Sequence, residues 1–245
     1  MFEILRNKGF ILDTTKEQKF NKFSTLLKEW NKKFNLTAIK DDEEIEIKHF
    51  EDSLEGAKFF PENASVCEIG SGGGFPSIPL MIYREDLKFT LVESVGKKCE
   101  FLNFAIKELN LNAKVINKRA EDLGKDSNFR ESFNVVTARA VARLNTLSEY
   151  TIPLIKKGGL FIAYKSKNDE ELNESQNAFK ILGAKYIKSY DYSLSNNQGE
   201  RSVHIVEKLS TTPSIYPRGN GKERSKPLWR ILNYNQLVVL QATEF

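Results

Sequence analysis

The pattern of hydrophobic positions changes near residue 64, from a helical period before it to alternating short blocks after it. Residues 1–60 carry an apolar stripe whose members recur three and four positions apart, which predicts an amphipathic helix. The stripe consists of Phe20, Phe23, Leu26, Leu27, Trp30 and Phe34. Thr15 followed by Gln18 resembles a capping box at the start of this helix. A second helix is expected from about Asp42, because the acids of its first turn suit the helix dipole.

Short apolar runs alternate with helical segments from residue 64 onward. Strands are expected near residues 64–69, 87–92, 113–117, 133–138, 158–165, 184–192 and 201–208. Helices are expected near residues 77–84, 96–109, 142–157 and 168–182. This alternation predicts an α/β fold with a doubly wound, mainly parallel, seven-stranded sheet that helices cover on both faces. The last two strands are expected to form an antiparallel hairpin at the sheet edge, since residues 196–199 have the composition of a turn.

The same pattern divides the chain into three segments. Residues 1–61 are expected to form an N-terminal helical cap, residues 62–209 the α/β domain, and residues 210–245 a basic C-terminal tail. The basic residues of the tail are Arg218, Lys222, Arg224, Lys226 and Arg230. Because they stand among glycines and prolines, the tail is expected to be a mobile arm. The apolar run at 232–240 indicates one last element that the pattern does not place.

Composition narrows the class of protein. The chain has 245 residues, of which 40% are hydrophobic, so it has enough apolar side chains for a packed core. It contains no run of about 18 apolar residues, so no membrane span is expected. The N-terminus lacks the form of a signal peptide, and the expected location is the cytoplasm. A formal charge of +4 is compatible with a nucleic-acid partner without requiring one.

Cysteine and histidine offer little chemistry. Cys67 and Cys99 are expected to pack as small hydrophobic side chains. The only histidines are His49 and His204, and neither has another histidine or a cysteine at ligand spacing. No metal site is therefore expected. His204 is expected to be structural, because it lies between two apolar residues of a strand.

A glycine-rich turn follows the first strand, at Gly70, Gly72 and Gly74. The second strand ends at Glu93, 23 residues after Gly70; one β-α-β step of a nucleotide-binding fold takes about 20 residues. A dinucleotide fingerprint would need a glycine at Phe75, which disfavours a dehydrogenase. The G-x-G-x-G spacing is that of S-adenosylmethionine-dependent methyltransferases, with a plain tight turn as the alternative.

Further motifs extend over most of the chain. They are Trp30-Asn31-Lys32-Lys33-Phe34-Asn35-Leu36-Thr37, His49 with Asp52-Ser53, residues 68–80, residues 91–98, Arg119-Ala120-Glu121, Ala138-Arg139-Ala140, Lys165, Gly199-Glu200-Arg201, Tyr216-Pro217-Arg218 and Lys226-Pro227-Leu228. In this order they resemble the bacterial glucose-inhibited division protein B family, the small-subunit ribosomal RNA methyltransferases that modify a guanine at N7. The chain departs from the family at Ser77 and Ser166, where glycine is usual, and continues beyond the family's usual end after Leu228.

The resemblance implies a Rossmann-like class I methyltransferase fold and S-adenosylmethionine as the cofactor. The cofactor residues that it implies are Gly70, Gly72, Gly74, Phe75, Glu93, Ala120, Glu121 and Arg139. Glu93 would accept hydrogen bonds from ribose hydroxyls, and Ala120 and Glu121 would lie beside the adenine. Glu121 has an alternative reading as an acid that a helix N-terminus favours.

Basic residues at strand ends are the candidates for the substrate side, since loops at the carboxyl edge of such a sheet form its ligand site. Arg139, Lys165 and Arg201 are the expected catalytic residues, and Lys97, Arg119, Lys165, Arg201 and Arg218 the expected RNA-binding residues. For each one alone, a solvated surface charge is an equal alternative. The tail is expected to add phosphate contacts. His49 belongs to the family signature without an assigned chemical role.

The activity that the resemblance implies is methyl transfer to N7 of a guanine in small-subunit (16S) ribosomal RNA. Two alternatives remain open at this point. A methyltransferase for a small molecule or protein would explain the glycine turn but not the basic residues or the cap. A non-catalytic RNA-binding assembly factor would retain the fold without binding the cofactor. Free RNA and RNA within a ribosomal subunit are both compatible with the sequence.

Overall fold

Residues 2–228, the part of the chain that the computed structural model describes, are organised around one seven-stranded sheet. The strands are β1 (Ser65–Ile69), β2 (Lys88–Glu93), β3 (Ala113–Asn117), β4 (Phe133–Arg139), β5 (Ile155–Ser166), β6 (Ala184–Ser193) and β7 (Glu200–Lys208). Their order across the sheet is β3-β2-β1-β4-β5-β7-β6. Strands β1 to β5 pair in parallel, and β7 is antiparallel to both of its neighbours. The predicted doubly wound sheet is confirmed.

The hairpin between β6 and β7 also forms where it was predicted. Asn196 and Asn197 have φ angles of 53° and 56°, a left-handed conformation that asparagine tolerates better than most residues. The hairpin pairs Ser193 with Glu200 and carries β6 to the edge of the sheet.

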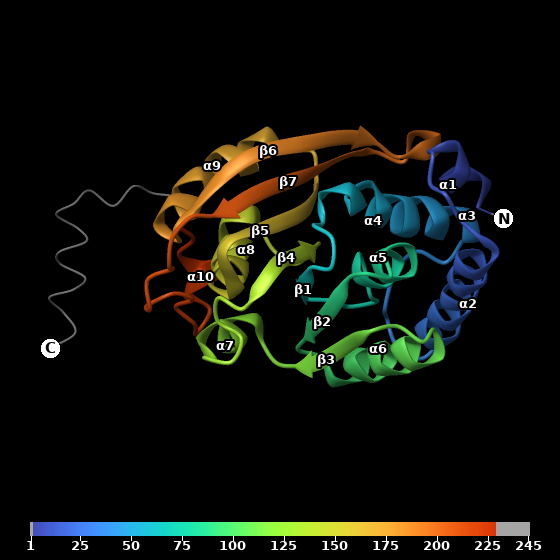
Figure 1. The fold of residues 1–245 in the computed structure, drawn as a ribbon, viewed down its shortest axis with the longest axis horizontal. Coiled ribbons are helices and arrows are strands. Elements are labelled where there is room, and N and C mark those ends of the chain that lie inside the picture. Colours follow the sequence, from blue (N-terminus) through green and yellow to red (C-terminus); the bar gives the residue numbers. More distant parts are fainter. Residues whose placement is uncertain (1, 229–245) are drawn as a thin grey trace, which may run out of the picture.

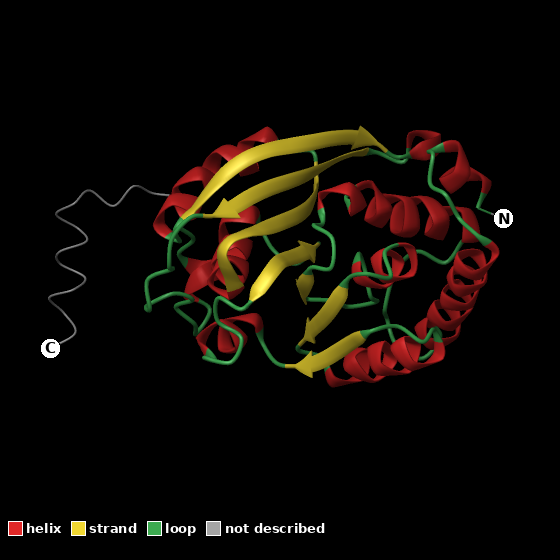
Figure 2. Ribbon diagram, in the orientation of Figure 1, coloured by secondary structure: helices red, strands yellow, loops and turns green. Residues whose placement is uncertain are grey.

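Helices lie on both sides of the sheet (Figure 1). They are α1 (Glu3–Asn7), α2 (Thr14–Asn31), α3 (Asp42–Ile45), α4 (Asp52–Glu55), α5 (Ser77–Tyr83), α6 (Gly96–Glu108), α7 (Ala120–Lys125), α8 (Leu144–Thr151), α9 (Asp169–Ile181) and α10 (Lys222–Ser225). Helices α1 to α6 cover one face, on the right in Figure 1, and α7 to α10 cover the other. Figure 2 shows the same layers by type of secondary structure.

Each face of the sheet has its own hydrophobic core. Val66 of β1 faces the core beneath α2, α5 and α6, whereas its neighbour Cys67 faces the core beneath α8 and α9. This alternation follows from the two-residue period of a strand. Phe20 and Phe50 of the N-terminal cap belong to the first core together with Phe101 of α6. The cap therefore shares its core with the sheet, and the division at residue 61 stays a prediction.

The N-terminal helices differ from the predictions in detail. The cap of α2 is Asp13, whose carboxylate accepts a hydrogen bond from the backbone N–H of Lys16 at 2.8 Å, so the capping box predicted at Thr15 is wrong. The second helix begins at Asp42 as expected, with the Asp41 side chain as its cap. Its middle turn, Glu46–Glu51, is a π-helix, a form that is frequent at functional sites.

The predicted C-terminal boundary of α8 is wrong. The helix was expected to continue to residue 157, but it ends at Thr151, and a 3₁₀ turn at Ile152–Leu154 leads into β5. The backbone N–H groups of Glu131 and Ser132 bond to the carbonyls of Pro153 and Leu154. These bonds hold the segment extended beside the start of β4. Helix α7, which spans six residues, was not predicted.

The described part of the tail packs on the α7 and α8 side of the molecule, and we call residues 210–225 the C-terminal strap. The Arg130 guanidinium donates hydrogen bonds to the backbone carbonyls of Thr212, Pro213 and Tyr216 at 2.8–3.2 Å. Arg218 pairs with the buried carboxylate of Glu149 at 2.7 Å. The expectation of a mobile arm is therefore wrong for residues 210–225. Arg230 and the apolar run at 232–240 lie outside the described residues.

Candidate active site

The glycine loop after β1 has a backbone that side chains would disturb. Gly70, Gly72 and Gly74 have φ angles of +70°, +53° and +86°, which favour glycine. A Cβ on Gly70 would lie 2.6 Å from Cγ2 of Val141, and a Cβ on Gly74 would lie 2.5 Å from Cδ1 of Ile78. Gly70 thus allows the loop after β4 to approach, and Gly74 allows α5 to pack closely.

The Glu93 carboxylate joins the first two loops. It is buried at the end of β2. One oxygen accepts a hydrogen bond from the N–H of Gly72 at 3.0 Å, and the other accepts from the N–H of Val95 at 2.8 Å. The Ser94 hydroxyl also lies 3.5 Å from the oxygen that Val95 uses. A carboxylate has about four acceptor positions, so Glu93 retains one for a further hydroxyl donor.

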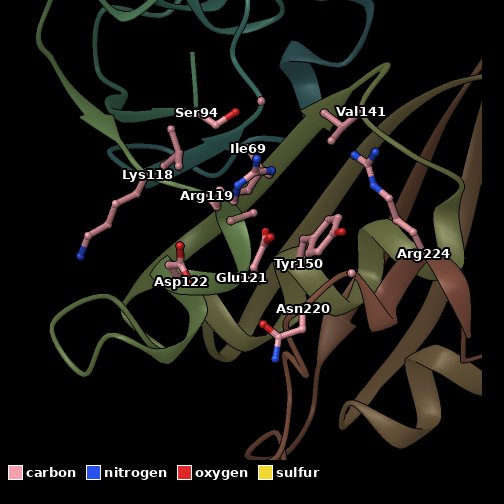
Figure 3. Close-up of a pocket in the computed structure, with 14 residues that line it drawn as sticks. Ile69, Ser94, Lys118, Arg119, Glu121, Asp122, Val141, Tyr150, Asn220 and Arg224 are labelled. Atoms are coloured by element: carbon pink, nitrogen blue, oxygen red, sulfur yellow. The ribbon is translucent and has the colours of Figure 1, made fainter. Parts of the chain in front are cut away.

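A pocket of about 520 Å³ opens where β1, β2 and β3 end (Figure 3). Its wall includes four of the residues expected at the site, namely Gly70, Arg119, Ala120 and Glu121. The opposite wall comes from Tyr150 of α8 and from Asn220, Gly221 and Arg224 of the C-terminal strap. In Figure 3 the side chains of Glu121, Tyr150 and Arg224 surround one space. The strap, which was expected to contact only RNA phosphates, thus contributes to the wall of the pocket itself.

Glu121 satisfies both readings of its sequence. It lies in the first turn of α7, and its side chain also lines the pocket. Burial raises the pKa of the neighbouring Tyr150 hydroxyl, a hydrogen bond from Arg224 opposes this shift, and the Glu121 charge adds to it.

The other expected cofactor residues do not line this pocket. Gly72, Gly74 and Glu93 belong to the glycine loop and the end of β2. Phe75 and Arg139 belong to a polar cluster at the end of β4.

Arg139 donates to Asp52 at 2.7 Å and to the carbonyl of Lys48 at 3.1 Å. The second Asp52 oxygen accepts from the Tyr192 hydroxyl at 2.8 Å and lies 3.8 Å from Nε of Arg201. Asp52 thus brings together two of the three expected catalytic residues.

Phe75 forms the floor of this cluster. His49 stacks on it with the ring centroids 4.0 Å apart, and the Arg139 guanidinium lies 5.0 Å from the same ring. His49 also bridges Oγ1 of Thr37 at 2.8 Å and Nη2 of Arg139 at 3.0 Å. Burial, with the nearby Arg139 charge, lowers the pKa of His49 to about 3, so the ring is neutral near pH 7. No chemical role was assigned to His49 from the sequence. Its contact with Nη2 indicates that it positions Arg139.

The remaining expected cations do not join the Asp52 cluster, and each has a different partner. Nζ of Lys165 lies 2.6 Å from Glu171 and donates to the Ala142 carbonyl at 2.9 Å, so it holds the loop after β4. Lys97 lies over the ring of Phe34, away from the Arg139 cluster, with its nitrogen 4.9 Å from the ring centre. The Glu149 carboxylate engages Arg218, which argues against the expected contact of Arg218 with RNA.

Buried titratable groups elsewhere are structural or unassigned. Both carboxyl oxygens of Glu68 are buried and make no hydrogen bond of good geometry among the described residues. Burial raises the pKa of Glu68 to about 7, and the nearby Ser77 and Ser71 hydroxyls oppose this shift. Burial lowers the pKa of His204, in keeping with a structural role. Cys67 and Cys99 are free thiols. Within residues 2–228 there is no metal-type grouping of three or more His, Cys, Asp or Glu residues, and no helix suited to span a bilayer.

Sequence reasoning missed several residues of the site. Asp52 stood in a quoted motif, but nothing in its sequence showed that two arginines would meet it. Tyr150 and Tyr192 carried no local signal, and Arg224 was expected only as a phosphate contact of the tail. Their proximity to the site depends on contacts between distant segments, such as the 140 residues that separate Tyr192 from Asp52.

The comparison with protein families decides the identification. The family model described as rRNA small subunit methyltransferase G (GidB) matches residues 16–198. The chain belongs to this family. It is 45% identical over 230 residues to the ribosomal RNA small subunit methyltransferase G of Staphylococcus aureus strain RF122, covering 92% of this chain and 96% of the relative. The relative in strain Newman is 44% identical over the same coverage. The predicted family is confirmed.

Solved structures support the fold. A putative transferase from Pyrococcus horikoshii has a TM-score of 0.53 at 14% identity, covering 66% of this chain and 63% of its own. TYW2 from the same organism, in complex with MeSAdo, has a TM-score of 0.51 at 15% identity and covers 64% and 61%. At these identities the likeness concerns the fold alone. It agrees with the class I arrangement predicted for this methyltransferase family member.

Proposed function

We propose that this protein transfers the methyl group of S-adenosylmethionine to N7 of a guanine in small-subunit (16S) ribosomal RNA. The observation that carries the proposal is the pocket at the carboxyl edge of β1 to β3, where Gly70, Ala120 and Glu121 meet. Its volume of about 520 Å³ is within the range of small-molecule sites, about 300–1,000 Å³. The Staphylococcus relatives are named for methylation of the same class of RNA.

The described residues fit the adenosine part of this cofactor. Gly70 lines the pocket, and the lack of a Cβ there lets Val141 of the loop after β4 pack against it. After the donors Gly72, Val95 and Ser94, the Glu93 carboxylate keeps a free acceptor position for a ribose hydroxyl. Ala120 and Glu121 line the space beyond β2, where the adenine would lie.

The residues of this chain are expected to align the guanine with the methyl group rather than to transfer a proton. When bound, the cofactor supplies a methyl group on a positively charged sulfur. Guanine N7 has a free lone pair and no proton, so the chain needs no general base there. What the residues must provide is orientation of the base and exclusion of water. The absence of a nucleophile–base pair from the expected catalytic residues is consistent with this task.

We assign the cluster around Asp52 to the substrate side. Arg139 and Arg201 both face its carboxylate, at 2.7 and 3.8 Å. An arginine can bind guanine O6 and N7 together, but N7 must stay free to react. The arginines are therefore assigned to O6 or to a phosphate. Lys165 positions the loop after β4 through its bond to the carbonyl of Ala142.

Methyl transfer with a labelled cofactor tests the proposal. Tritium from the methyl group should enter small-subunit RNA, supplied both as free RNA and as assembled subunits. Glu93→Ala should abolish incorporation, because the ribose loses its carboxylate and the glycine loop loses the bond at Gly72. Glu100→Ala is the matched control, since Glu100 is exposed on α6. Strand scission at N7-methylguanine then maps the base.

Two outcomes would overturn the proposal. Label that enters protein and neither form of RNA would favour a different methyltransferase. A protein that does not bind S-adenosylhomocysteine in equilibrium dialysis would favour a non-catalytic RNA-binding factor.

A further inference from the structure

Several of the cations expected at the site are paired with carboxylates within the fold. Arg139 pairs with Asp52, and Lys165 and Arg218 pair with buried or half-buried glutamates at 2.6 and 2.7 Å. Binding of RNA draws most of its electrostatic affinity from Lys and Arg side chains that can neutralise phosphates. Cations near the site that have no carboxylate partner are therefore the better candidates for further phosphate contacts.

Four exposed lysines of the cap and of α6 are such cations. Lys32, Lys33, Lys40 and Lys97 have no carboxylate partner within ion-pair distance among residues 2–228. Neighbouring cap lysines differ, since Lys28 pairs with Asp42. We call these four the cap-lysine surface.

Aromatic side chains hold this surface together. Nζ of Lys33 lies 5.9 Å from the centre of the Trp30 ring, and Nζ of Lys97 lies 4.9 Å from that of Phe34. The two rings are themselves 5.9 Å apart. Lysine ammonium groups that lie over ring faces are attracted by them, so Lys33 of the turn after α2 and Lys97 of α6 are kept on one side of the cap.

A hollow of about 230 Å³ lies at the other end of the same surface. Its lining residues are Leu27, Lys28, Asn31, Lys32, Thr37, Ile39 and Lys40. Lysines act as point charges toward phosphate. The hollow thus combines room for one phosphate group with two lysines that have no carboxylate partner.

The cap-lysine surface is tied directly to the candidate active site. The Asn31 side chain accepts from the N–H of Leu36 and donates to the Thr37 carbonyl, both at 2.8 Å, which fixes the loop after α2. The carbonyl oxygen of Leu36 lies 3.5 Å from the position of a Cβ on Gly73. Through Thr37, the same loop reaches His49, which bonds to Arg139.

We propose that the cap-lysine surface binds phosphates of the RNA strand next to the modified guanine. The inference rests on the proposed function, because the RNA is the substrate assigned there. Phosphate is favoured over stacked bases, since lysines already cover the aromatic faces. The alternative occupant is an acidic protein, and the test below distinguishes it from RNA.

The test compares two double variants. Lys32→Gln/Lys33→Gln removes two charges from the cap-lysine surface. Lys156→Gln/Lys157→Gln is the control, because it removes two exposed charges at the start of β5, whereas the candidate active site lies at the carboxyl ends of the strands. Binding of small-subunit RNA is measured over a series of salt concentrations, and S-adenosylhomocysteine binding is measured by calorimetry. The cap variant should lose RNA affinity and reduce the slope of log K against log salt by about 1.4–1.8, from 0.7–0.9 per phosphate contact. The control variant should have the RNA affinity and the salt slope of the wild-type protein.

Equal RNA affinity and salt slope in the two variants would overturn the inference. Unchanged S-adenosylhomocysteine binding shows that the cap variant is folded. If that binding is lost, Lys40→Gln/Lys97→Gln provides a second pair of charges with the same expected slope change. If the cap variant bound an acidic ribosomal protein more weakly but kept its RNA affinity, that result would also contradict the inference. Failure of the proposed function itself would be seen in the wild-type protein, which would then leave RNA unmethylated, whether it binds RNA or methylates protein instead.

Discussion

The buried ion pair between Glu149 and Arg218 holds the C-terminal strap against α8, and Glu149→Gln perturbs it with little change of volume. The carboxylate accepts from the backbone N–H of Arg218 at 2.8 Å and from its guanidinium at 2.7–3.2 Å. The Glu149 side chain is 1% exposed and that of Arg218 is 21% exposed. Glutamine keeps one acceptor oxygen but removes the charge that Arg218 faces.

The magnitude follows from this burial. Removing one partner of a buried ion pair costs about 3–5 kcal/mol. Because Arg218 is partly exposed, water compensates in part, and we expect the low end, about 3 kcal/mol. For a chain of this length that loss lowers Tm by about 6–12 °C. The strap supplies Asn220, Gly221 and Arg224 to the pocket, so the affinity for S-adenosylhomocysteine should also fall.

Thermal unfolding and calorimetric titration of S-adenosylhomocysteine measure both effects. Glu174→Gln is the matched control, because Glu174 pairs with Arg143 at 2.6 Å while their side chains are 27% and 57% exposed. Exposed pairs contribute about 0–1 kcal/mol, so Tm should change by less than about 4 °C. A Glu149→Gln protein with wild-type Tm and affinity would refute the role given to the strap.

Two further predictions concern the cores. Gly56→Ala should destabilise by about 1–3 kcal/mol in urea unfolding, because the new Cβ would lie 2.1 Å from the Tyr164 hydroxyl oxygen; an unchanged midpoint would contradict this packing. The raised pKa of Glu68, about 7 against 4.5, gives stability that is present below pH 4.5 and lost as pH rises through 7. Glu68→Gln should remove this loss of about 3 kcal/mol, and parallel stability–pH curves for wild type and variant would contradict the assignment.

The sheet was predictable because each strand carries its own signal. Blocks of apolar residues bounded by turns lie within three residues of the observed strands, and the turn before Glu200 uses two asparagines at positive φ. The glycine loop was predictable for the same reason, because Gly70 and Gly74 have positive φ angles that favour glycine, and the spacing of glycines within one short segment shows this.

The partners of the cations were not predictable from the sequence. Arg139 meets Asp52 across 87 positions, and Arg218 meets Glu149 across 69. Nothing local distinguishes these carboxylates from solvated ones. The strap was misread because Arg130 holds it through backbone carbonyls, which every sequence possesses. Helix α7 was missed because six residues are too few to show a helical period.

A crystal structure of the protein with S-adenosylhomocysteine tests the central claim most directly. The adenosine should lie between Gly70 and the Ala120–Glu121 turn, its ribose hydroxyls at Glu93, and the sulfur should point toward Arg139. Product bound in any other cavity, with this pocket holding only solvent, would contradict the account.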